Sequence, residues 1–156
     1  MQAGSTSLPA FLFAEHFMSL YKQFATNTDL EKRGIYLDFG PNSKGQPTRF
    51  LVARAGGANG AYLKAMEHKV KPIKRQIQNE TIELAQIERL TMEVYCQTVV
   101  LGWEGVEDAE GNPLPHSYEN AVKLFTDLPD LFKDIQEQAA KSALFRQALL
   151  EADSGN

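Results

Sequence analysis

The sequence predicts a mainly α-helical fold of about five helices with a small antiparallel β-hairpin near residues 34–54. Apolar residues recur at spacings of three and four over most of the chain, and two β-prone segments flank a Pro- and Gly-containing loop. With 43% hydrophobic and 23% charged residues among 156, the composition is that of an ordinary globular domain. We therefore expect one domain over residues 8–151, with flexible ends at 1–7 and 152–156.

The first predicted helix runs from about Pro9 to Phe24, and proline is favourable early in a helix because its missing N–H would be unpaired there. An apolar stripe follows it at spacings of 4, 3 and 4: Phe13, Phe17, Leu20 and Phe24. Residues 27–31 then read as a turn with capping residues.

The hairpin is predicted from two β-prone runs, residues 34–40 and 48–54. Between them, residues 41–47 contain two prolines and one glycine, which is loop chemistry. Alternation in the second strand places Phe50 and Val52 on one face. Because an isolated hairpin is marginally stable, we expect it to pack on helices.

The next helix is expected over Gly60–Gln78, after a glycine-rich strand-to-helix turn in which Asn59 can serve as the N-cap. Pro72 lies inside this helix and removes one backbone hydrogen bond. The sequence therefore predicts a kink or a break near Lys71.

A central helix, capped by Asn79 or Thr81, is predicted to run to about Leu101. Its seam alternates at spacings of 3 and 4: Leu84, Ile87, Thr91, Val94, Thr98 and Leu101. Cys96, the only cysteine, lies in this helix without a nearby base, so core packing is favoured over reactivity.

Two helices close the chain after a turn-rich connection at residues 102–115. Ser117 can cap a short helix from Tyr118 to Thr126, and Asp127 can cap a last helix from about Leu128 to Glu151. The face of the last helix that is expected to be buried contains Leu131, Ile135, Ala139, Ser142, Phe145 and Leu149.

The net charge of -4 conceals an asymmetry. Residues 1–78 carry 11 basic and 5 acidic side chains, whereas residues 79–156 carry 5 basic and 15 acidic ones. Either the two halves pack together and partly neutralise each other, or the charges form surfaces for a partner. The basic side chains cluster around one helix: Arg49, Arg54, Lys64, Lys69, Lys71, Lys74 and Arg75. An acidic protein surface fits this cluster better than DNA, because the chain is acidic overall and lacks a nucleic-acid-binding signature.

No recognisable catalytic or metal-binding pattern emerges, so we expect no enzyme activity, no metal and no cofactor. Gly56–Gly60 resembles a phosphate-binding loop only superficially, and Asp108–Asn112 lacks the ligand pattern of a calcium loop. The three histidines lack zinc-site spacing: His16, His68 and His116. No apolar run approaches the length of a membrane-spanning helix. Trp103, the sole tryptophan, either anchors its loop in the core or serves as a partner-binding hot spot.

Several segments, in this order, together resemble a tail assembly chaperone of long-tailed, siphovirus-type bacteriophages. They are Leu20-Tyr-Lys-Gln-Phe-Ala-Thr26, Leu30-Glu-Lys-Arg-Gly-Ile-Tyr-Leu-Asp-Phe39, Ala53-Arg-Ala-Gly-Gly-Ala-Asn59, Lys71-Pro72, Val100-Leu-Gly-Trp-Glu-Gly-Val106, Gly111-Asn-Pro-Leu-Pro115, Glu119-Asn120 and Leu128-Pro-Asp-Leu-Phe132. The resemblance covers roughly residues 20–148. The segment before Leu20 and the long loop at Pro41–Pro47 depart from the family pattern.

The resemblance implies a non-enzymatic role in the host cytoplasm. Such chaperones bind the tape-measure protein, keep its helices soluble, recruit tail-tube subunits and are usually absent from the finished virion. Two other classes stay open, a structural tail component retained in the virion and a small nucleic-acid-binding regulator. The segregated charge leaves two uses open, packing of the two halves within one copy and self-association of copies. The candidate partner-binding residues are Phe13, Phe17, Phe24, Arg54, Lys64, Lys71, Lys74, Arg75, Trp103, Phe145 and Leu149.

Overall fold

The structure, a computed structural model, describes residues 19–146. Its elements in chain order are α2 (Leu20–Phe24), α3 (Thr28–Arg33), β1 (Ile35–Pro41), β2 (Pro47–Val52), α4 (Gly60–Val70), the 3₁₀ helix η1 (Lys71–Ile73), α5 (Lys74–Gln78), α6 (Leu84–Thr98), β3 (Val100–Glu104), α7 (Tyr118–Asp127) and α8 (Pro129–Ala139). Residues 142–146 are also helical. The fold is therefore mainly helical, as predicted, with a sheet that is larger than a hairpin.

The sheet has three antiparallel strands in the order β1-β2-β3. The predicted hairpin is confirmed, with Leu37 opposite Phe50. The third strand corrects the prediction of a helix that continues to Leu101. Helix α6 ends at Thr98, and Val100 pairs with Val52 of β2. The backbone N–H and C=O groups of β3 find their hydrogen-bond partners in β2, so these residues do not need the partners that a continued helix would provide.

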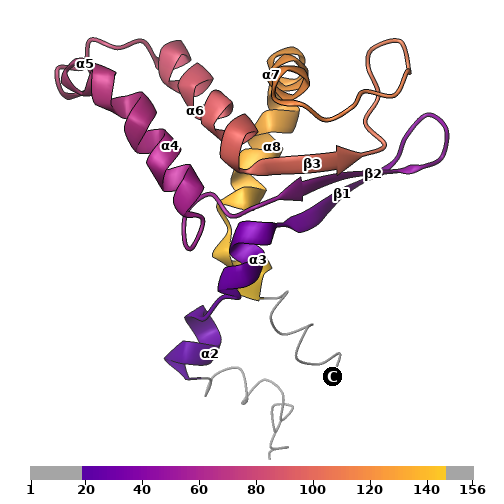
Figure 1. The fold of residues 1–156 in the computed structure, drawn as a ribbon, viewed down its shortest axis with the longest axis horizontal. Coiled ribbons are helices and arrows are strands. Elements are labelled where there is room, and N and C mark those ends of the chain that lie inside the picture. Colours follow the sequence, from indigo (N-terminus) through magenta and orange to yellow (C-terminus); the bar gives the residue numbers. More distant parts are fainter. Residues whose placement is uncertain (1–18, 147–156) are drawn as a thin grey trace, which may run out of the picture.

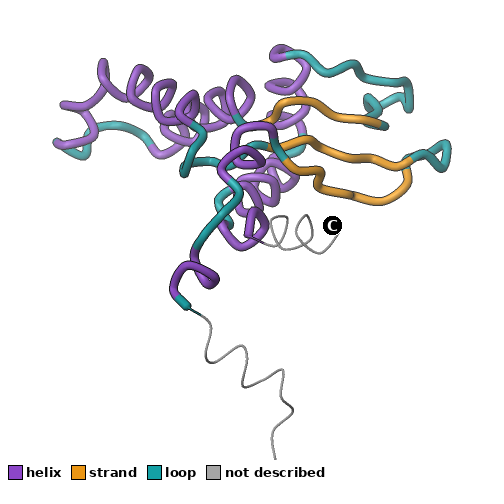
Figure 2. The backbone as a smooth tube through the Cα atoms, turned by 60° about the horizontal axis from the view of Figure 1, so that its bottom comes forward, coloured by secondary structure: helices purple, strands orange, loops and turns teal. Residues whose placement is uncertain are grey.

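The helices extend from one side of the sheet and cover one of its faces (Figure 1). Helix α4 packs beside α6, and α8 passes behind the strands in this view. Figure 2 shows the three strands side by side at one end of the molecule and the long helices reaching toward the other. The core lies between sheet and helices and includes Phe50 from β2, Tyr95 from α6, Phe125 from α7 and Ile135 from α8.

The helical hairpin of α4, α5 and α6 confirms the predicted break and corrects the predicted cap. Helix α4 passes into η1 at Lys71, as Pro72 requires. Helix α6 begins at Leu84 after Glu83 rather than after Asn79 or Thr81, because Asn79 ends α5. Leu84, the first residue of the predicted seam, is 70% exposed.

The structure also corrects the predicted turn at residues 27–31 and both predicted ends of the last helix. Residues 27–31 belong largely to helix α3, and the side chain of Asn27 accepts hydrogen bonds from the N–H groups of Asp29 and Leu30. Ser117 caps α7 as predicted, but Asp127 is the last residue of α7 and not the cap of α8. Helix α8 ends at Ala139. Of the predicted first helix, α2 is the described part, capped by Ser19; residues 9–18 and 147–151 lie outside the described residues.

Candidate partner-binding surfaces and the Glu31 node

A buried carboxylate joins the N-terminal helices to the loop between β2 and α4. Glu31 is 1% exposed and forms an ion pair with Arg54, with 2.9 Å between Oε2 and Nη1. Its Oε2 accepts a second hydrogen bond from the N–H of Ala58 at 3.0 Å, and its Oε1 accepts one from the hydroxyl of Thr26. We call Glu31, Thr26, Arg54 and Ala58 the Glu31 node. It fixes the segment that follows α2 against the glycine-rich turn.

The glycine-rich turn at residues 56–60 is thus a strand-to-helix turn, as predicted. The anionic group that its backbone binds is the carboxylate of Glu31 in the same chain, through the N–H of Ala58. Burial alone would raise the pKa of Glu31, but hydrogen bonds from Thr26, Ala58 and Arg54 outweigh it and hold the pKa below its usual value. Asn59 precedes α4, yet its side-chain amide donates to the carbonyl oxygens of Arg54 and Thr98 instead of capping the helix.

The Glu31 node also explains why residue 57 is a glycine. Gly57 has a φ of +54°, and a Cβ placed there would collide with Oε2 of Glu31 and lie 2.7 Å from Nη1 of Arg54. We expect Gly57→Ala to lower the free energy of unfolding by about 2 kcal/mol, through backbone strain and displacement of the ion pair.

Chemical denaturation of the two alanine variants Gly57→Ala and Gly60→Ala tests this expectation. A Cβ added at Gly60 would have no atom within 4 Å, and Gly60 begins α4, so Gly60→Ala should leave stability unchanged or raise it by about 0.5 kcal/mol. Equal effects of the two substitutions would contradict the role assigned to Gly57.

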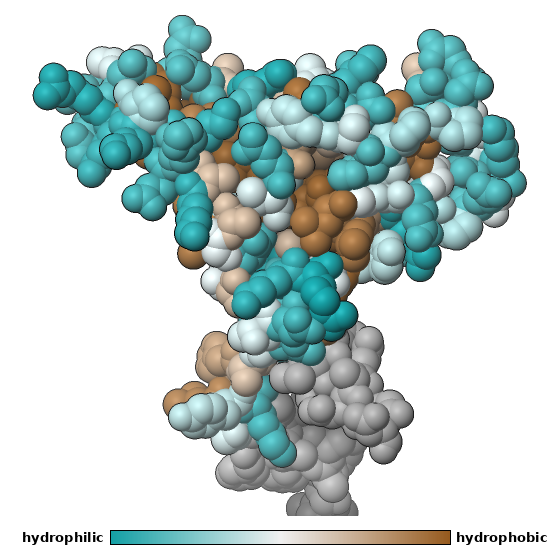
Figure 3. Space-filling view, viewed as in Figure 1, coloured by the Kyte–Doolittle hydropathy of each residue, from teal (hydrophilic) through white to brown (hydrophobic). Residues whose placement is uncertain are grey.

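The first candidate surface is an apolar row on α2. Leu20, Tyr21 and Phe24 are 71%, 85% and 66% exposed, and α2 has no buried residue. We call these three the α2 apolar row; Figure 3 shows hydrophobic atoms on this helix, below the main body. Arg146 places its guanidinium 5.7 Å from the centre of the Phe24 ring. The predicted partners Phe13, Phe17 and Leu149 lie outside the described residues.

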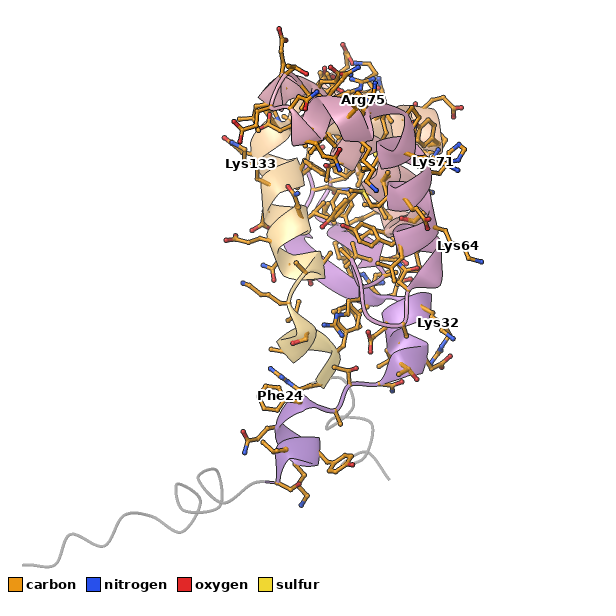
Figure 4. All side chains as sticks on the ribbon, turned by 90° about the vertical axis from the view of Figure 1, so that its left-hand side faces the viewer. Phe24, Lys32, Lys64, Lys71, Arg75 and Lys133 are labelled. Carbon is orange, nitrogen blue, oxygen red and sulfur yellow. The ribbon has the colours of Figure 1, made fainter. Side chains whose placement is uncertain are left out.

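The second candidate surface is basic. Lys64, Lys71, Lys74 and Arg75 are all exposed on α4, η1 and α5, and within residues 19–146 none of them forms an ion pair. Arg54 is separate from them, because it is held in the Glu31 node. Figure 4 shows Lys64 and Lys71 along one margin of the molecule, with Arg75 above them.

Both interpretations of the charge asymmetry therefore find some support. Within the described residues, two ion pairs join the basic and acidic halves, Arg49 with Glu104 at 2.6 Å and Lys69 with Glu93 at 3.2 Å. Burial alone would raise the pKa of Glu93, but Arg89 and Lys69 outweigh it and lower the pKa. The exposed lysines of α4 and α5 are not paired with acidic side chains in the described part of the chain, so their charge is free for a partner.

Trp103 and Phe145 are structural in the described part of the chain. The indole N–H of Trp103 donates to the carbonyl of Leu114 at 2.7 Å, and its ring contacts Phe50 and His116 edge-on. This geometry supports the loop-anchoring interpretation of Trp103. Phe145 is fully buried, so its side chain is not available on an exposed surface.

Cys96 lies in the core, as predicted, and burial raises the pKa of its thiol to about 12. Asp108 accepts hydrogen bonds from the N–H groups of Glu110 and Asn112, which makes residues 108–112 the ordinary turn that was expected. Among residues 19–146, no group of three His, Cys, Asp or Glu side chains is placed to hold a metal ion. No helix in the same part of the chain has the length and hydropathy needed to cross a membrane.

Sequence reasoning missed Glu31, Leu20 and Tyr21 as site residues. The two apolar residues could have been found from their place beside Phe24 in the same helix. Glu31 gave no local signal, since its partners Arg54 and Ala58 lie 23 and 27 positions further along the chain.

The arrangement is that of a small, mainly helical protein with exposed apolar and basic helix faces. The family model of the YdaY prophage protein matches residues 57–156. The chain belongs to this family and is of phage origin. No curated protein and no solved structure matches it.

Proposed function

We propose that this prophage protein is a non-enzymatic tail assembly chaperone. It binds the tape-measure protein, recruits tail-tube subunits during tail morphogenesis, acts in the host cytoplasm and leaves the finished particle. Three observations support the proposal: the phage origin of the family, the ordered motifs that resemble such chaperones, and the α2 apolar row. The last of these carries it, because a chaperone needs an apolar surface that its client can cover.

The α2 apolar row suits a helical client. Tyr21 and Phe24 are aromatic, and aromatic side chains dominate the binding energy of protein interfaces. An amphipathic client helix binds by laying its apolar face on a hydrophobic surface of its partner, and the α2 apolar row offers such a surface. Through Thr26, the Glu31 node fixes the residues just after α2, so the row is presented from a defined point on the body.

Co-expression with the tape-measure protein of the same prophage tests the proposal. The double variant Leu20→Ser with Phe24→Ser should reduce the soluble fraction of the tape-measure protein severalfold, because two apolar contacts are lost. Soluble client is measured by quantitative gel analysis of clarified lysates, with the chaperone level held equal.

Leu84→Ser provides the matched control, since Leu84 is 70% exposed on α6 and lies outside the α2 apolar row. It should leave the client as soluble as the native chain does. Equal solubility with the α2 variant would contradict the assigned surface. Mass spectrometry of purified phage particles addresses the rival class: an abundant signal from this chain would identify a structural tail component instead.

A further inference from the structure

Three exposed basic side chains on α4 and at the start of η1 form one row. Lys64, His68 and Lys71 occupy positions i, i+4 and i+7, which lie on one face of a helix. Arg75 is exposed on α5, beyond the break at Ile73, and is not part of this row. We call these three the basic row. Glu67 is the only carboxylate on these elements.

Helix α8 carries a row of the opposite sign. Asp130, Asp134 and Glu137 occupy positions i, i+4 and i+7, on the face turned away from the buried Phe132 and Ile135. We call these three the acidic row. Within residues 19–146, none of them forms an ion pair.

The two rows match each other in spacing and in order of charge. Along α4 and η1 the order is Lys64, Glu67, His68, Lys71, and along α8 it is Asp130, Lys133, Asp134, Glu137. When the two series are aligned in the same direction, Lys64 faces Asp130, Glu67 faces Lys133 and Lys71 faces Glu137, so each pair has opposite charges. His68 faces Asp134 and can donate a hydrogen bond to its carboxylate. The two helical segments therefore offer complementary faces of the same length.

Within one copy, the basic row and the acidic row cannot contact each other. In Figure 4, Lys64 and Lys71 lie along one margin of the molecule, and α8 with Lys133 lies along the opposite margin. Charge complementarity without internal pairing is the arrangement that a second copy can satisfy.

We propose that the basic row of one copy binds the acidic row of a second copy. This contact is heterologous: a pair of copies still has one free basic row and one free acidic row, so further copies add head to tail. Because all charges of the contact except the half-buried Asp134 are exposed, salt screens it.

Sedimentation velocity of the purified full chain, at about 50 mM and about 500 mM NaCl, tests the proposal. At low salt we expect species larger than a monomer that grow with protein concentration, and at high salt a monomer. Lys64→Ala with Lys71→Ala should weaken the association about tenfold, and Asp130→Ala with Glu137→Ala should do the same.

Mixing the two variants is the decisive measurement. One variant keeps a native acidic row and the other keeps a native basic row, so together they should form a one-to-one dimer and nothing larger. Lys22→Ala with Lys44→Ala is the matched control, because it makes the same charge change as the first variant away from both rows and should associate like the native chain. Circular dichroism confirms that each variant is folded.

Three results would overturn the proposal. They are a native chain that is monomeric at low salt, a mixture of variants that forms no dimer, and a control variant that loses association equally. Retention of a monomeric native chain on random-sequence DNA, lost on changing Lys64 and Lys71, would assign the basic row to nucleic acid instead.

Discussion

Replacing Glu31 with alanine is expected to lower the free energy of unfolding by about 3 kcal/mol. The substitution leaves the guanidinium of Arg54 without its ion pair and removes the acceptor for the hydroxyl of Thr26 and the N–H of Ala58. Breaking a buried pair from one side is costly because the remaining charge stays partly desolvated. Urea denaturation followed by circular dichroism measures the change.

Glu88→Ala is the control for this substitution, because Glu88 is exposed and forms no ion pair among the described residues. It should change stability by less than about 0.5 kcal/mol. Glu31→Gln should fall between the two, since the amide oxygen still accepts one hydrogen bond. A Glu31→Ala variant as stable as Glu88→Ala would show that the node contributes nothing.

The same variant should respond differently to acid. The pKa of Glu31 is lowered in the folded chain, so its ionised form stabilises the fold fully above the unfolded-state pKa of about 4.3. That contribution is lost as the pH falls through the folded pKa. The stability gap between the native chain and Glu31→Ala should therefore be constant near neutral pH and shrink below about pH 4.3. A gap that widens on acidification would contradict the lowered pKa.

Phe50→Ala should have an effect of similar or greater size, about 4 kcal/mol. Phe50 is 1% exposed in the middle of the sheet, and its ring lies 5.4 Å from Phe39, 5.7 Å from Trp103 and 6.3 Å from Phe125, between centroids. Alanine removes this ring and leaves a cavity where the sheet meets α7. Thermal and urea unfolding both measure the loss.

Phe24→Ala is the matched control, because the same side chain is removed from an exposed position on α2. Its effect on stability should stay near zero, since the site is already hydrated. Phe50→Leu, which keeps most of the apolar volume, should lose less than Phe50→Ala and remains measurable if the alanine variant does not fold. Equal losses for Phe24→Ala and Phe50→Ala would contradict the assigned core.

Local patterns were sufficient where the determinant is local. Pro72 predicts the break between α4 and α5, and Ser117 predicts the start of α7. Val100 shows the opposite case, since it continues the apolar run of α6 and becomes a strand residue only because Val52 lies beside it. No glycine or proline directly follows Ala139, so the sequence has no local signal that predicts the end of α8 there.

The candidate surfaces divide in the same way. The exposed lysines of α4 and α5 could be predicted from helical spacing, because a charged face opposite an apolar one stays in water. The fates of Arg54 and Phe145 could not. Arg54 is drawn away by Glu31, and Phe145 is buried although its helical segment lies near the end of the described chain.

The order of the strands limits what the family region can do by itself. The match to the YdaY prophage protein begins at residue 57, after β1 and β2 have already passed. A fragment cut at that point would lose Phe50 and Val52 from its core and leave β3 without its neighbour, exposing an unpaired edge. We therefore expect that the segment matched by the family does not fold stably by itself, and truncations for biochemical work should retain the strands that precede it.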